Sequence, residues 1–400
     1  MIALVLLAHL RRAPPRTPRH VIISTVLAFG ILAVSSPLLT AEDQPTPPPD
    51  LVRLRVLTLN MYGLRYPPQL GWTADQSDCA GRFKTVAAQI RSADPPYDIV
   101  AIQELYRAPD LHIITCDPTS FLDALARTSA RFGRSQRILF SPKGERWKLE
   151  ADGGIGLVTP YSIEQSQALR FAGSGGPFLA ARGVLYARIA LPNSPVKVDA
   201  YVVHLSPGRR NSEQRRRELE ALSKLVAAKS SASGNPVLVL GDFNIEGPPN
   251  VGGEYGTILG LLGNPRDLWL EDNPTGPGYT YDCWANAVAE LRGCDYQARI
   301  DYLWVVTNRG LSNSDYEVSI SKDRNVRRVE WHTGGPKPLP VSDHYGVEAF
   351  LSIGRKNSAP PPKQDSEKLA QGSPRQAPPR RHQTTVKTTS RRVRRAVVPR

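Results

Sequence analysis

Several features that mark particular protein classes are scarce or missing in this 400-residue sequence. It has four cysteines and no C-x-x-C pair, which excludes a thioredoxin-like motif and the usual zinc-finger spacing. No G-x-G-x-x-G segment follows a strand pattern and opens a helix, which disfavours a single dinucleotide-binding sheet. The main apolar run, residues 21–34, is short for a membrane span, which needs about 20 residues. The hydrophobic fraction of 40% still allows a well-packed core.

Positive charge is concentrated at the two ends of the chain. The formal net charge is +14, but residues 41–354 contain 34 Lys and Arg against 35 Asp and Glu. Residues 355–400 contain 13 bases and only two acids. The central part therefore lacks the basic surplus typical of nucleic-acid binding. Only the tail has the charge for an anionic partner such as acidic lipid, and a solubilising extension with no partner is the alternative.

Residues 1–41 predict an export signal. Four arginines lie within residues 11–19, before the apolar run, and residues 33–35 offer the small side chains of a cleavage site. A retained signal anchor is the alternative, because the run can be extended to Leu39. We therefore expect a secreted or periplasmic protein, anchored to the membrane if the signal is not cleaved.

The cysteine set agrees with export. Cys79, Cys116, Cys283 and Cys294 form an even set that allows three pairings, of which Cys79–Cys116 with Cys283–Cys294 is the most local. Four free thiols would be the less favoured alternative in an oxidising compartment.

Composition divides the rest of the chain. Residues 42–50 are a proline-rich linker, and residues 51–354 form one domain. Residues 355–400 are rich in Pro, Ser, Thr, Gln and Arg, and we expect this basic tail to be disordered because it has too few large apolar residues for a core.

Short β-rich runs alternate with helical patterns in the domain. Strands are expected at residues 52–60, 97–103, 137–141, 154–159, 184–191, 196–205, 237–242, 299–306, 316–320 and 346–353. Helices are expected at residues 82–92 and 120–132, and in a longer segment capped by Asn211. This element count favours an α/β domain of two packed sheets with helices outside.

Polar side chains stand where the expected strands end. Each alone has an ordinary explanation, because Asp and Asn often terminate strands and a strand histidine is often structural. The set contains eight residues, namely Asn60, Glu104, His204, Asp242, Asn244, Asp301, Asp343 and His344. Side chains at strand ends converge on one rim of a sheet, where pockets form.

The residue types in this set indicate a chemistry. Carboxylate and amide oxygens suit a hard cation such as Mg²⁺, and no cysteine is present to favour zinc. A histidine paired with an aspartate is the usual form of an oriented general base. Together they are suited to attack on a phosphorus ester by water.

At these residues the sequence resembles the endonuclease/exonuclease/phosphatase superfamily, which has the fold of deoxyribonuclease I. The segments LTLNMYG, AIQELY, VVHLS, LGDFN, RIDYLWV and SDHYGV occur in that superfamily's order. The resemblance implies a four-layer sandwich of two central mixed β-sheets flanked by helices.

The resemblance also implies a role for each site residue. Glu104 and Asn60 would hold Mg²⁺, or another divalent cation such as Mn²⁺, with Asp343 supporting the metal side. His344 would be the general base, oriented by Asp301. The remaining three residues would act on water and substrate: Asp242 would position the attacking water, and Asn244 and His204 would donate hydrogen bonds to phosphoryl oxygens.

Within the superfamily the sequence is more similar to secreted neutral sphingomyelinases of the phospholipase C type. The segments GGIGLVT and RGVLYARI look like their central hairpin, and EYGTIL, GYTYD and Asn286 follow the same order. A departure is Ser206-Pro207, where those enzymes usually have a glutamine. The similarity to sphingomyelinases still favours a phospholipid over nucleic acid as the phosphodiester substrate. A monomer is assumed.

Two alternatives remain open at this point. A secreted nuclease would need a local basic patch, which Arg209, Arg210 and residues 215–217 could form beside His204. A catalytically silent binding module on the same fold is the other, although every catalytic residue type is present.

Overall fold

A computed structural model describes residues 51–64, 79–106, 116–126, 137–140, 152–175, 180–247, 252–308, 310–335 and 338–356. The export signal, the linker and nearly all of the basic tail predicted from the sequence lie outside these residues. No helix within the described segments is long and apolar enough to cross a membrane.

The described elements alternate between strands and helices along the chain. In order they are β1 (Val52–Asn60), α1 (Cys79–Ser92), β2 (Ile99–Gln103), α2 (Thr119–Ala126), β3 (Arg137–Phe140), β4 (Gly156–Thr159), β5 (Ser162–Arg170), β6 (Gly183–Ala190), β7 (Lys197–His204), a 3-10 turn (Arg209–Asn211), α3 (Ser212–Ser230), β8 (Val237–Asp242), α4 (Gly253–Leu261), β9 (Arg266–Asp267), α5 (Leu268–Asp272), β10 (Tyr281–Asp282), α6 (Ala287–Glu290), β11 (Gln297–Ala298), β12 (Asp301–Val306), β13 (Tyr316–Ile320), β14 (Arg327–Val329) and β15 (Gly346–Arg355).

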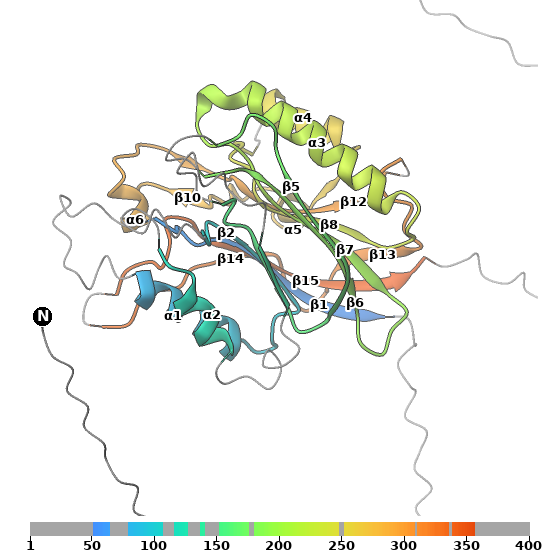
Figure 1. Ribbon diagram of the computed structural model, residues 1–400, viewed down its shortest axis with the longest axis horizontal. Coiled ribbons are helices and arrows are strands. Elements are labelled where there is room, and N and C mark those ends of the chain that lie inside the picture. The colour runs from blue at the N-terminus through green and yellow to red at the C-terminus, as the bar shows by residue number, and fades with distance from the viewer. Residues whose placement is uncertain are drawn as a thin grey trace, which may run out of the picture. The chain divides into compact units, whose positions relative to one another are not determined.

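Two mixed sheets form the centre of the domain (Figure 1). The first has the order β13-β15-β1-β2-β4-β3, with β14 added beside β15. The second has the order β5-β6-β7-β8-β12-β9. Each sheet has one parallel pair, β1 with β2 and β7 with β8, among antiparallel neighbours.

Three hydrophobic layers hold these elements together. The layer between the sheets contains side chains from β1, β6, β7, β8, β12 and β15. A second layer joins α1 and α2 to the first sheet, and a third joins α3 and α4 to the second sheet (Figure 1). The order helices, sheet, sheet, helices confirms the predicted four-layer sandwich.

Side chains of the central strands are buried on both faces of each sheet. In β7, Val198, Ala200 and Val202 point between the sheets, while Tyr201 and Val203 pack toward α3. Side chains that alternate along a strand face opposite sides of its sheet, so a strand covered on both sides has few polar positions. Such strands appear in the sequence as dense apolar runs, which makes them predictable.

Three local expectations were wrong. The segments GGIGLVT and RGVLYARI do not form a hairpin, because β4 pairs with β2 and β3 while β6 pairs with β5 and β7 in the other sheet. Asn211 precedes α3 but its side chain does not cap the helix; its amide donates to Pro207 O at 2.6 Å. Strand β15 continues to Arg355, two residues beyond the strand expected at residues 346–353.

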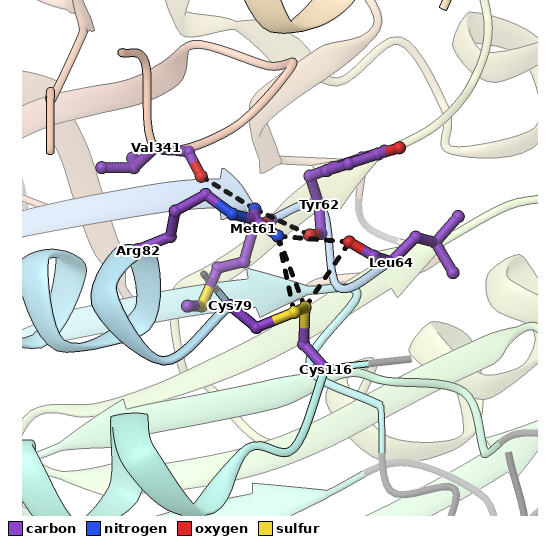
Figure 2. The surroundings of a disulfide bond; sticks show 7 residues. All are labelled: Met61, Tyr62, Leu64, Cys79, Arg82, Cys116 and Val341. Atoms are coloured by element: carbon purple, nitrogen blue, oxygen red, sulfur yellow. Dashed lines mark hydrogen bonds between the residues drawn. A yellow bond between two sulfur atoms is a disulfide. The ribbon is translucent and has the colours of Figure 1, made fainter. Parts of the chain in front are cut away.

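Both disulfides of the most local pairing are present, Cys79–Cys116 and Cys283–Cys294. The first ties the start of α1 to the segment before α2 (Figure 2). Beside it, the guanidinium of Arg82 donates to the carbonyls of Met61, Tyr62, Leu64 and Val341 (Figure 2). Arg82 therefore ties the segment that follows Asn60 to the segment that precedes His344, beside the disulfide.

Candidate active site

The strand-end residues continue the inward-facing rows of the core. His204 follows Ala200 and Val202 at a spacing of two, and Asp242 follows Leu238 and Leu240 in the same way. Because side chains at this spacing share one face of a strand, these polar groups point between the two sheets. Asp301 and Asn60 occupy the same inward positions of β12 and β1.

Strand register brings these residues side by side. His204 pairs with Asp242 across β7 and β8, and Asp301 pairs with Asp242 across β12 and β8. From the other sheet, Asn60 Nδ2 donates to Asp242 Oδ2 at 3.0 Å. All four residues are about 1% exposed. The sequence-predicted cluster therefore bridges the two sheets at one end.

His344 reaches the cluster from the loop before β15. Its Nδ1 lies 2.9 Å from Asp301 Oδ2, and the edge of its ring contacts Tyr281, with ring centroids 5.2 Å apart. Its backbone N–H donates to Ser342 Oγ, which in turn donates to Asn60 O at 2.6 Å. A carboxylate at Nδ1 leaves Nε2 as the ring nitrogen that can accept a proton.

Asp242 and Asn244 are held by the turn after β8. The backbone N–H of Asn244 donates to Asp242 Oδ1 at 2.8 Å, and Asn244 Nδ2 donates to Leu205 O at 3.0 Å. Gly241 approaches Val203 so closely, at a φ of 147°, that a Cβ would lie 2.0 Å from Val203 O. The glycine of LGDFN is therefore required by backbone packing.

Glu104 follows β2 in a left-handed backbone conformation, with a φ of 60°. Its Oε2 is buried and has no hydrogen-bond partner among the described residues. An uncompensated buried carboxylate oxygen is costly, so the side chain fits a bound cation. Asn244 also has a positive φ, 51°, and such strained positions cluster at functional sites.

Asp343 is engaged by protein groups. Its Oδ2 forms an ion pair with Arg292 Nη1 at 2.7 Å, and its Oδ1 lies 3.9 Å from His344 Nε2. The Asp343 carboxylate therefore lies between Arg292 and His344. Arg292 is 42% exposed along its side chain.

Other donor atoms also lie close enough together for a metal. Among the described His, Cys, Asp and Glu residues, atoms of Asp242, Asp301 and His344 lie within 4.8 Å of one another, and Asp301 Oδ1 has no hydrogen-bond partner. Oxygen donors with one imidazole suit a hard divalent cation better than a soft one.

The two histidines have opposite electrostatic surroundings. Burial lowers the pKa of His344, but the carboxylates of Asp301, Asp343 and Asp242 outweigh it and raise the pKa to about 10. Burial lowers the pKa of His204 well below its ordinary value, and the charges of Arg182 and His344 lower it further. Burial also raises the pKa of Asp242, with the charge of Asp301 adding to the effect.

Sequence reasoning missed several residues that complete the site. Arg182 contacts His204, Arg292 contacts Asp343, and Tyr281 packs on His344. Arg182 could have been found, because it directly precedes a buried strand at the same sheet end as His204. Arg292 lies in the segment after α6 and Tyr281 in the two-residue strand β10, and neither has a periodic pattern that would place it.

A cleft of about 520 Å³ adjoins the cluster at Asn244. Its walls include Arg209, Glu246 and Tyr296, and the guanidinium of Arg209 lies over the Tyr296 ring, 5.3 Å from the centroid. The cleft is wide enough for the part of a substrate that extends beyond the reacting phosphate.

A model of the endonuclease/exonuclease/phosphatase family matches residues 57–344, which is more than half of the chain. The match includes every strand-end residue of the predicted site. A search of curated protein sequences finds no match.

Solved structures give a consistent comparison. Sphingomyelinase C from Streptomyces griseocarneus is 18% identical, with a TM-score of 0.51 over 75% of this chain and 99% of that one. Beta toxin from Staphylococcus aureus, solved with bound magnesium ions, is 17% identical, with a TM-score of 0.51 over 75% and 99%. TDP2 from D. rerio, solved with a single-strand DNA product, is 16% identical, with a TM-score of 0.51 over 75% and 98%. At these identities the likeness establishes a shared fold.

Proposed function

Because the chain belongs to the endonuclease/exonuclease/phosphatase family, we propose that it hydrolyses a phosphodiester with water in the presence of a divalent cation. The observation that carries this proposal is the buried cluster of Asp242, Asp301, His204 and His344, bridged to the other sheet by Asn60. Such groups are rarely buried together without a chemical task.

His344 is the proposed general base. The Asp301 carboxylate accepts from Nδ1, so in the neutral form of His344 it is Nε2 that takes a proton from the attacking water. The water oxygen bonds to phosphorus as the bond from phosphorus to the leaving oxygen breaks, and the leaving alkoxide becomes an alcohol by taking a proton from solvent. Asp301 then stabilises the imidazolium that forms, without itself accepting the proton.

Glu104 and Asn60 are the proposed cation ligands. The buried, unpartnered Oε2 of Glu104 supports this assignment, as does the Oδ1 of Asn60, which bonds only to the Tyr62 N–H among the described groups. A divalent cation bound there supplies charge neutralisation for a phosphoryl oxygen. One amide N–H of Asn244 donates to Leu205 O, and the other, which has no partner in the described part of the chain, can donate to the same phosphate.

A phospholipid is the substrate class that we propose in preference to nucleic acid. The arginines after β7 were candidates for a phosphate-binding patch, but they are largely neutralised by neighbouring acids. Arg215 pairs with Glu254, Arg216 with Glu213 and Glu220, and Arg209 with Glu246. Because nucleic-acid affinity depends on unpaired cationic side chains, this surface is poorly suited to a polynucleotide.

We also propose that the protein is exported. Two disulfides within the domain fit an oxidising compartment, since such bonds rarely persist in a reducing one. This agrees with the signal expected in residues 1–41.

A substrate panel tests the proposal. The purified chain is given sphingomyelin, other phospholipids, plasmid DNA and a phosphomonoester, each with Mg²⁺ and with excess EDTA. We expect hydrolysis of a phospholipid head-group ester that stops in EDTA. Faster cleavage of DNA than of any lipid would reassign the protein as a nuclease, and no turnover of any phosphodiester would favour a binding module.

A further inference from the structure

His204 has an unusual partner for a buried histidine. It is 1% exposed at the end of β7, and its Nδ1 lies 2.9 Å from Nη1 of Arg182. Arg182 directly precedes Gly183, which pairs with His204 in the register of β6 and β7. The register of two adjacent strands therefore places Arg182 beside His204.

The contact determines where the imidazole proton lies. A guanidinium only donates hydrogen bonds, so Nδ1 of His204 must accept and cannot carry a proton. A neutral imidazole then has its proton on Nε2, which lies 3.5 Å from Asp242 Oδ2. Protonation of Nδ1 would place an N–H donor and a positive charge next to the guanidinium, which is itself a donor and positively charged.

We propose that Arg182 is a positioning residue that holds His204 as a neutral imidazole with its proton on Nε2. His204 is then a fixed hydrogen-bond donor toward Asp242 and the substrate phosphate, and it does not shuttle a proton. The inference rests on the proposed function for the role of that donor, although the protonation state itself is independent of any activity.

The surroundings of both side chains support this assignment. Burial, the charge of Arg182 and the charge of His344 together lower the pKa of His204, which favours its neutral form. Burial alone would lower the pKa of Arg182, but Tyr106, Glu104 and Asp242 outweigh burial and raise it, so Arg182 stays charged. The Tyr106 hydroxyl lies 3.4 Å from the same Nη1.

The two histidines thereby present the same ring nitrogen, Nε2, to the site with opposite hydrogen-bonding roles. At His344 a carboxylate contacts Nδ1, which leaves Nε2 as a proton acceptor. At His204 a guanidinium contacts Nδ1, which leaves Nε2 as a proton donor. One residue can accept from water while the other donates to an oxygen that gains negative charge.

Nitrogen NMR of the histidine side chains tests the proposal directly. In the full chain labelled with ¹⁵N-histidine, and with His204→Ala used for assignment, we expect His204 to show only the Nε2–H tautomer across the pH range of stability. Arg182→Met keeps most of the side-chain volume and removes the donors, so His204 should then populate both tautomers or titrate. Arg182→Lys restores a donor and should restore the single tautomer.

Arg188→Met is the matched control. Arg188 is another mostly buried arginine and lies within β6, but it pairs with Asp199 and should leave the His204 tautomer unchanged. If Arg182→Met leaves His204 entirely in the Nε2–H form, or if Arg188→Met disturbs it equally, the proposal is wrong. These spectra remain informative even if no hydrolytic substrate is found, so the two proposals can fail separately.

A double-mutant comparison tests the catalytic consequence. Arg182→Met should lower kcat on the order of 10- to 100-fold, the range typical for loss of a residue that orients a site histidine through its other ring nitrogen, and Arg182→Lys should recover much of it. In a His204→Ala background the same change should have little further effect, because Arg182 acts through His204. An equal loss in both backgrounds would contradict a positioning role and indicate a general structural one.

Discussion

At the scale of single residues, His344 is the group on which the proposed chemistry depends most. Its alignment rests on Asp301 at Nδ1 and on the Ser342 hydroxyl at its backbone N–H. His344→Ala should therefore lower the rate on the order of 10²–10⁴-fold with the fold intact, as measured by steady-state hydrolysis and circular dichroism.

His332→Ala is the matched control for that change. His332 is a histidine of the same domain whose Nε2 lies 3.1 Å from Glu330, away from the cluster. We expect it to leave the rate nearly unchanged. A comparable loss at both positions would mean that His344 has a structural role.

The charge of Asp301 should be visible in the pH dependence of the rate. The carboxylates around His344 favour its protonated form and raise its pKa above the ordinary value, against the effect of burial. Asp301→Asn removes one of these charges and so lowers the pKa. A general base works only when unprotonated, so the acid limb of the pH–rate profile should move to lower pH while the maximum rate falls.

Asp323→Asn, an acid outside the cluster, should leave that profile in place. If Asp301→Asn moved the acid limb to higher pH, Asp301 could not be the group that stabilises the protonated form of His344.

At the scale of elements, the Cys79–Cys116 disulfide closes a longer loop than Cys283–Cys294, with sequence separations of 37 and 11 residues. Loop closure restricts the unfolded chain more when the loop is longer. Replacing Cys79 and Cys116 by serine should lower the free energy of unfolding by about 2–4 kcal/mol, measured by urea denaturation.

The corresponding change at Cys283 and Cys294 should cost about 1 kcal/mol less, by the logarithmic dependence on loop length. A larger loss for the short loop would show that native packing around Cys283 outweighs chain entropy.

Strands buried on both faces were predictable because their apolar runs are dense and end abruptly at polar groups. The edge strand β5 was missed, since SIEQSQALR is largely exposed and is held by its pairing with β6. The two-residue strands β10 and β11 have no periodicity to detect. The sequence therefore predicted the strands that are buried on both faces, and it did not predict an exposed edge strand or two-residue strands.

The site was predictable to a similar degree. His204, Asp242 and Asp301 are visible as polar ends of apolar rows, so their convergence could be expected. The contacts of Arg182 with His204 and of Arg292 with Asp343 link residues 22 and 51 positions apart. No local pattern encodes such pairs, because they depend on sheet register and loop packing.

At the scale of the whole molecule, the chemistry and the basic tail should be separable. Strand β15 ends at Arg355, and Lys356 still bonds to Asp315 and Ser314, so a truncation after Lys356 preserves the described fold. The truncated chain should hydrolyse a small soluble phosphodiester at the full-length rate. On anionic vesicles at low salt it should bind more weakly than the full chain, and the difference should disappear at high salt.

Loss of turnover on the soluble substrate would instead make the tail part of the active site. Equal vesicle binding by both chains would remove its proposed role at an anionic surface.

The central claim is that a divalent cation held by Glu104 supports hydrolysis of a phosphodiester at this cluster. The most direct measurement is the hydrolysis rate of the metal-stripped chain against added Mg²⁺, for the wild type and for Glu104→Gln. Gln keeps the size of the side chain and removes the charge of the carboxylate whose buried Oε2 has no partner among the described residues. We expect Mg²⁺ to restore the wild-type rate and excess EDTA to abolish it, while Glu104→Gln stays nearly inactive at the same Mg²⁺ concentration. Wild-type turnover that persists in excess EDTA, or Glu104→Gln with an unchanged Mg²⁺ response, would contradict the claim.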